Sequence, residues 1–137
     1  MSKPRIFMRE QLKKEIDPIV QNFFYNTFNK AKYPYAVLDI KELDNEALTQ
    51  YLLEIEIWDK SEDTTQLETI CDDLKSYLDK KKVVKDNYAY VIWFSSCLTD
   101  KEDDRTIKKR VLSFEIHLFN YVWKENSYDT DYYKGTG

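Results

Sequence analysis

The chain has 137 residues and a formal net charge of -4, a length typical of one domain with its own core. Hydrophobic residues make up 42% and charged residues 34%, the balance of a globular protein and not of a disordered chain. The acidic excess argues against a protein that binds duplex DNA by neutralising phosphates. Both glycines, Gly135 and Gly137, lie at the C-terminal end, which excludes glycine-built phosphate and dinucleotide loops from the body of the chain.

The chain is also poor in metal-binding side chains. Cys71, Cys97 and His117 are its two cysteines and its one histidine, and their number and spacing do not fit a structural zinc site. We therefore expect no metal and no cofactor. The N-terminus shows no apolar signal core, and no apolar run approaches the ~20 residues of a membrane-spanning helix. These features predict a soluble protein without a membrane partner, made in a reducing cytoplasm where its thiols stay free.

The first part of the chain predicts a helix, an ambiguous segment and a strand. Residues 6–16 favour a helix, and Asp17 followed by Pro18 marks its end or a restart. Residues 19–28 fit a helical period, but their aromatic cluster suits a strand equally well, so both alternatives stay open. The apolar alternation of residues 35–43 then predicts a strand.

A second strand and a second helix follow. The strand is predicted by strict alternation of apolar and acidic residues, with Leu53, Ile55 and Ile57 on one side and Glu54 and Glu56 on the other. It is expected to form an antiparallel hairpin with the preceding strand. Asp63 is expected to cap the helix with Gln66 as its reciprocal partner, and the basic run Lys80–Lys82 is expected to close it. One apolar stripe runs along this helix, made of Leu67, Ile70, Cys71, Leu74, Tyr77 and Leu78.

Two long strands complete the predicted sheet. Residues 88–98 are almost continuously apolar, as expected for a central strand covered on both faces, and this interpretation places Trp93 and Cys97 in the core. Residues 107–123 begin with a clear alternation and predict the last strand, with His117 on its outward side.

The order α-(β)-β-β-α-β-β predicts an α+β fold. Its simplest form is an antiparallel sheet of four to five strands with the helices packed on one face. We expect a single domain over residues 1–125 and a polar, flexible tail over residues 126–137.

No residue pattern predicts an enzyme. His117 is the candidate general base, but no nucleophile or orienting partner accompanies it in a recognisable motif, so a surface histidine is the better interpretation. Acidic pairs such as Asp103-Asp104 are expected by chance in a chain with 25 acids. Cys71 and Cys97 are interpreted as small core residues.

Aromatic residues are the stronger functional signal. Trp58 ends a predicted strand whose outward side also carries Glu54 and Glu56, and Trp123 lies close to Tyr121 in the C-terminal part of the chain. Large aromatic side chains at such places either pack at the edge of a core or form protein interfaces. We treat these five residues as a candidate interface, with the first three on the face of the sheet that the helices leave open.

The succession of these elements resembles a known family. The run KYPYAV at residues 32–37 opens one strand, LEIEIWD at residues 53–59 ends the next, and a capped helix and two further strands follow. In the order and spacing of these features, from about Lys32 to Trp123, the chain is similar to the tail-completion and tail-terminator proteins. These proteins join head and tail in long-tailed bacteriophages and prophages.

The resemblance implies a structural subunit without catalysis and without a cofactor. Such a subunit forms a ring with copies of itself, typically of six, at the head-proximal end of the tail tube. Its partners are then the tail-tube protein and the head connector protein, and DNA passes through the lumen without specific binding. The resemblance also implies a place in the virion, after synthesis and assembly in the bacterial cytoplasm, and it favours a strand over residues 19–26.

Two other classes of function stay open. A cytoplasmic adaptor would bind one protein partner on the open face of the sheet, and a hydrolase would use His117 or the acidic pairs. In a ring, negative charge at the lumen would be useful because it repels DNA. The acids of the loop between the last two strands are the candidates for this position, namely Asp100, Glu102, Asp103 and Asp104. A solvated turn on the outer wall is the alternative for this loop.

Overall fold

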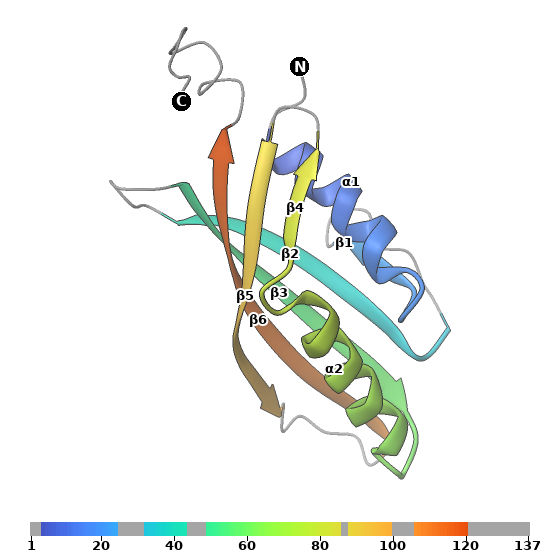
Figure 1. Cartoon of the computed structure of the whole chain (residues 1–137). Coiled ribbons are helices and arrows are strands. Elements are labelled where there is room, and N and C mark those ends of the chain that lie inside the picture. The colour runs from blue at the N-terminus through green and yellow to red at the C-terminus, as the bar shows by residue number, and fades with distance from the viewer. Residues whose placement is uncertain (1–3, 25–31, 44–48, 86–87, 100–105, 121–137) are drawn as a thin grey trace, which may run out of the picture.

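The computed structural model describes residues 4–24, 32–43, 49–85, 88–99 and 106–120. These residues form two helices and six strands, a mixed α+β fold as predicted (Figure 1). The elements in chain order are α1 (Pro4–Ile16), β1 (Asn22–Phe24), β2 (Tyr35–Leu43), β3 (Thr49–Lys60), α2 (Thr65–Leu78), β4 (Lys82–Lys85), β5 (Tyr88–Thr99) and β6 (Ile107–Asn120). Within the described ranges, no helix is long and apolar enough to cross a membrane.

The six strands make one sheet in the order β1-β2-β3-β6-β5-β4. The predicted hairpin of β2 with β3 is present, and the last strand, β6, lies in the centre between β3 and β5. The prediction of an antiparallel sheet is wrong at one edge, because β1 runs parallel to β2 with Asn22 opposite Ala36. The sheet also has six strands instead of four to five, since β4 adds a strand at the other edge.

Strand β1 resolves the ambiguity of residues 19–28 in favour of a strand over Asn22–Phe24. Asn22 is fully buried, and its side-chain amide donates to the Asp17 carboxylate at 2.8 Å and to the Lys13 carbonyl at 3.3 Å. These bonds tie the end of α1 to the start of β1. The chain therefore turns at once from the helix to the sheet edge, and no second helix begins within residues 17–24.

The predicted end of the second helix at Lys80–Lys82 is wrong, because β4 begins at Lys82. The run Lys80–Lys82 does not close the helix, because α2 ends at Leu78. Lys80 has a φ of 65°, the left-handed conformation in which helices commonly end and which glycine adopts at lower cost. The chain then turns back along β5, where the Ile92 amide donates to the Lys81 carbonyl at 3.0 Å. The basic run is thus divided between a helix exit and an edge strand.

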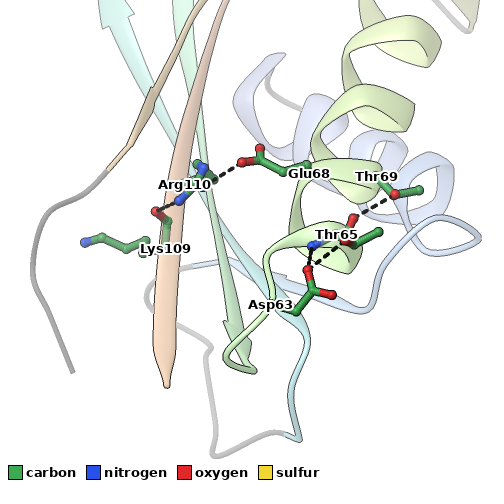
Figure 2. A network of polar contacts seen from close by, with 6 residues as sticks. All are labelled: Asp63, Thr65, Glu68, Thr69, Lys109 and Arg110. Atoms are coloured by element: carbon green, nitrogen blue, oxygen red, sulfur yellow. Dashed lines mark hydrogen bonds and ion pairs between the residues drawn. The ribbon is translucent and has the colours of Figure 1, made fainter. Parts of the chain in front are cut away.

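The start of α2 differs in detail from the predicted capping box. The N-cap residue is Thr64, whose side chain makes no capping hydrogen bond. Asp63 accepts hydrogen bonds from the Thr65 amide at 2.8 Å and from the Thr65 hydroxyl at 2.7 Å (Figure 2). These two bonds lower the pKa of Asp63. An Asp63–Thr65 turn, one residue further out, therefore replaces the expected pairing of Asp63 with Gln66.

Both helices pack on the same face of the sheet (Figure 1). The predicted inward residues Leu53, Ile55 and Ile57 are fully buried, and the apolar stripe of α2 packs against the same core apart from the exposed Tyr77. The largest fully buried side chains come from helices and strands alike: Tyr90, Phe114, Met8, Leu12, Ile16, Leu38, Leu53, Ile55, Ile57, Leu67, Leu74 and Leu78. The core therefore lies between one helical layer and one side of the sheet.

Strand β5 is not covered on both faces, which corrects the prediction made from its apolar run. Trp93, expected in the core, is 41% exposed, and Leu98 is 60% exposed. Cys97, also expected in the core, is exposed. The register shifts by one residue between Phe94 and Ser96, a β-bulge that redirects the end of the strand. Because the helices cover one side of the sheet, every second residue of β5 before the bulge points to the other side.

Candidate functional site

The candidate site is the side of the sheet that neither helix covers, which we call the open face. Its members follow from the strand register, because alternate residues of each strand point to the same side. They include Tyr35, Val37, Asp39 and Lys41 of β2, Gln50, Leu52, Glu54, Glu56 and Trp58 of β3, Lys109, Val111, Ser113, Glu115 and His117 of β6, and Val91, Trp93 and Leu98 of β5. This face combines carboxylates with large apolar side chains.

An aromatic stack occupies one end of the open face. Tyr35 and Trp58 lie opposite each other on β2 and β3, with ring centroids 6.4 Å apart and planes within 18°. Tyr33 extends the stack, 5.4 Å from Tyr35, and the Lys109 ammonium lies 4.7 Å from the Trp58 ring centroid. Burial, with Tyr33 and Glu56 nearby, raises the pKa of Tyr35. The three rings form a continuous aromatic surface, and the indole at its end makes a cation–π contact.

Carboxylates line the middle of the open face. Asp39 of β2 lies directly opposite Glu54 of β3, and Glu56 follows on the same side. Like charges placed opposite each other destabilise a sheet, and here Lys41 compensates in part through an ion pair with Glu54 at 3.4 Å. A partner surface carrying basic side chains would neutralise the remaining negative charge.

His117 and Trp93 lie together at the other end of the open face. The His117 Nε2 is 3.0 Å from the Gln50 amide nitrogen and 3.5 Å from a Glu115 carboxylate oxygen. The indole of Trp93 lies against the imidazole, with ring centroids 6.5 Å apart. None of these three neighbours is a nucleophile of the serine, threonine or cysteine type. The contacts position His117 as part of a surface.

The structure brings three of the predicted interface residues together. Glu54, Glu56 and Trp58 lie in succession on the outward side of β3, and the Trp58 indole donates to Glu56 at 3.4 Å. Tyr121 and Trp123 lie outside the described residues, as do the predicted loop acids Asp100, Glu102, Asp103 and Asp104 and the predicted tail at residues 126–137.

Trp93 is the residue that sequence reasoning missed. The nearly continuous apolar run around it predicts a place in the core, whereas the side chain is exposed. The alternation within that run identifies the side to which Trp93 points. Tyr90 and Ile92 are fully buried, whereas Val91 and Trp93 are not. The exposed side chains of Trp93 and Leu98 make the open face more apolar than the sequence indicated.

Two further features lie apart from the open face. An open cavity of about 380 Å³ lies between α1 and β1, lined by Ile6, Arg9, Glu10, Lys13 and Phe24. The Arg9 guanidinium lies 5.0 Å from the centroid of the Phe24 ring in this cavity. Over the residues that the structure covers, no group of three or more His, Cys, Asp or Glu side chains is placed to hold a metal ion.

Comparison with known proteins adds a likeness of fold. A chain in the solved virion of a native gene transfer agent particle has the same fold, with a TM-score of 0.58 over 82% of this chain and 90% of that chain. The two chains share 9% sequence identity, so the likeness concerns the fold alone. No protein-family model matches the chain, and no curated protein matches it in sequence.

Proposed function

We propose that the protein is a structural subunit of a phage or phage-like virion, and within it a tail-completion or tail-terminator subunit. The observation that carries the proposal is the likeness of fold to a chain of a gene transfer agent virion, which extends over most of both chains. The order and spacing of features between residues 32 and 123 support the same role from the sequence.

The open face supports an assembly role. It carries the exposed Trp93 and Leu98 and, at one end, the half-buried stack of Tyr35 and Trp58, and aromatic side chains of this kind are enriched in protein interfaces. Burying them against another protein removes apolar surface from water, which is the main favourable contribution to association. The carboxylates around Glu54 would then select a partner with complementary charge.

In this role the subunit acts through binding and not through a reaction or a cofactor. Copies of it form a closed ring, typically of six, at the head-proximal end of the tail tube. The ring contacts the tail-tube protein and the head connector, and DNA passes through it without specific binding. The subunit is made and assembled in the bacterial cytoplasm and ends in the virion.

The first test is the composition of purified particles. The protein should copurify with them and be detected by mass spectrometry of the virion. A strain that lacks the gene should give separate heads and tails in electron micrographs, because the joining ring is missing. Complete particles from that strain, or purified particles without the protein, would contradict the virion role and leave the cytoplasmic adaptor as the better interpretation.

A matched pair of variants tests the open face. Trp93→Glu places a charge on the open face, whereas Ile6→Glu makes the same apolar-to-acidic change on α1, where the side chain is 46% exposed. Both variants should fold, as judged by circular dichroism. We expect Trp93→Glu to enter particles at least tenfold less than Ile6→Glu, since a buried interface tryptophan commonly contributes ~2 kcal/mol or more. Equal incorporation of both variants would show that the open face is not the interface.

A further inference from the structure

Two side-chain contacts fix the position of α2 over the strands β5 and β6. Near the start of the helix, Glu68 pairs with Arg110 of β6 at 2.7 Å (Figure 2). Two turns further along, the Lys75 ammonium lies 4.5 Å from the ring centroid of Phe94 on β5. Cys71 lies between these two anchors, on the buried side of the helix. The middle of α2 therefore faces the part of the sheet between Arg110 and Phe94.

The strand register places Cys97 in that part of the sheet. Cys97 pairs with Leu112 of β6. On the same side of the sheet, Arg110 lies two residues before Leu112 along β6, and Phe114, the partner of Phe94, lies two residues after it. Leu112 is buried in the same core as Cys71. The register therefore places Cys97 on the side of β5 that faces α2, at the level of the helix that carries Cys71 on its buried side, although 25 residues separate the two in the chain.

The two thiols differ in access to solvent. Cys71 is 5% exposed, and burial together with the neighbouring Cys97 raises its pKa to about 12. Cys97 is exposed, because β4 pairs with the first residues of β5 and does not extend to this level. An oxidant from solvent therefore meets Cys97 first, and Cys71 is the adjacent second thiol.

We propose that Cys97 and Cys71 form a dithiol site that oxidised glutathione, or another small disulfide, converts to an intramolecular disulfide. The Cys97 thiolate attacks one sulfur of the oxidant, forms a mixed disulfide and releases the first glutathione as a thiol. The Cys71 thiol gives its proton to water and attacks the Cys97 sulfur, which breaks the S–S bond of the mixed disulfide, and the second glutathione leaves as a thiolate that takes up a proton. Two electrons pass from the two protein thiols to the oxidant, and no other reactant is needed.

The disulfide would join α2 covalently to β5 and close a loop of the intervening chain, which includes all of β4. A cross-link of this kind restricts the unfolded chain and raises the thermal midpoint of unfolding. The thiol pair belongs to the subunit itself and does not depend on the virion role proposed above.

The test uses the whole chain incubated with oxidised glutathione, alkylated with N-ethylmaleimide in denaturant and digested without reduction. The wild-type protein should give a cross-linked peptide pair joining Cys71 and Cys97, no glutathione adduct and no alkylated cysteine. Its Tm should rise by several degrees and return to the starting value after dithiothreitol. Wild-type protein that keeps both thiols, or that holds glutathione on Cys97 with Cys71 alkylated, would overturn the proposal.

Two single variants separate the two steps. Cys71→Ala should stop at the mixed disulfide, with one glutathione per chain on Cys97. Cys97→Ala changes an exposed residue and should leave Cys71 unmodified, because the buried thiol is then out of reach of the oxidant. Rapid glutathione addition to Cys71 in the Cys97→Ala protein would contradict the proposed order of attack.

Discussion

At the scale of single residues, a buried polar atom without a partner lowers the stability of a fold. The hydroxyl of Tyr90 is such an atom, since it is buried and has no hydrogen-bond partner among the described residues. The ring itself is well packed, edge-on to Phe7 with centroids 6.0 Å apart. Burial, with Glu15 and Tyr77 nearby, raises the pKa of Tyr90, so the phenol stays neutral. An unpaired buried hydroxyl costs free energy that its removal restores.

Tyr90→Phe should therefore leave the free energy of unfolding unchanged or raise it by up to ~1 kcal/mol. The matched control is Tyr77→Phe, which makes the same chemical change but removes a hydrogen bond to Glu15 of 3.0 Å. This control should lose ~0.5–1 kcal/mol. Urea denaturation at pH 7 measures both variants. A larger loss for Tyr90→Phe than for Tyr77→Phe would mean that the Tyr90 hydroxyl has a partner after all.

At the scale of elements, one carboxylate connects the end of α1 to the segment between α2 and β4. Glu15 accepts hydrogen bonds from Gln11 at 2.6 Å and from the Tyr77 hydroxyl at 3.0 Å, and it pairs with the Lys81 ammonium at 3.1 Å. Burial alone would raise the pKa of Glu15, but the hydrogen bonds from Gln11, Lys81 and Tyr77 outweigh it and lower that pKa. The ionised form is therefore the one that holds the elements together.

A lowered pKa in the folded state predicts the direction of the pH dependence. The contribution of Glu15 to stability is complete above its unfolded pKa of about 4.5 and is lost as the pH falls through the lower folded value. Glu15→Gln should reduce the free energy of unfolding by ~1–2 kcal/mol at pH 7. As the pH falls below about 4.5, the free energy of unfolding of this variant should decrease less than that of the wild type.

The matched control for this element-scale prediction is Glu62→Gln, which removes the same charge from an exposed position before α2. Its stability at pH 7 should stay within ~0.5 kcal/mol of the wild type. Chemical denaturation over a pH series measures all three proteins. An acid-range profile of Glu15→Gln that is parallel to that of the wild type would contradict the role given to Glu15.

At the scale of the whole molecule, neither the outer edges of the sheet nor its open face is covered by another of the described helices or strands. The edge strands are short, with three residues in β1 and four in β4, which limits uncontrolled edge pairing. Beyond the end of β4, however, β5 has no neighbouring strand among the described residues on the side away from β6. Head-to-tail contacts between different surfaces of identical subunits generate rings when the rotation closes.

We therefore expect a monomer at low concentration and a closed ring at high concentration or on the tail. Light scattering across a concentration series measures the mass in solution, and electron microscopy of isolated tails reveals the ring. A stable closed dimer at every concentration would contradict this prediction, because a dimer uses one surface twice and leaves none for further subunits.

The sequence by itself determined the parts of the fold that a local period encodes. The alternation of Leu53, Ile55 and Ile57 with acids identified β3 and its buried side, and the stripe through Leu67 and Leu74 identified α2, because side-chain direction follows from backbone repeat alone. The same reasoning placed Glu54, Glu56 and Trp58 correctly on the outward side of β3.

The tertiary structure alone decided the features that depend on distant segments. The parallel pairing of β1 with β2 and the addition of β4 at the other edge require partners that no local pattern names. Trp93 is exposed because both helices pack on the opposite face, and a continuous apolar run does not tell which face stays uncovered. Cys97 faces the level of α2 that carries Cys71 because the anchors of α2 set its position over β5 and β6, and only long-range packing fixes such a position.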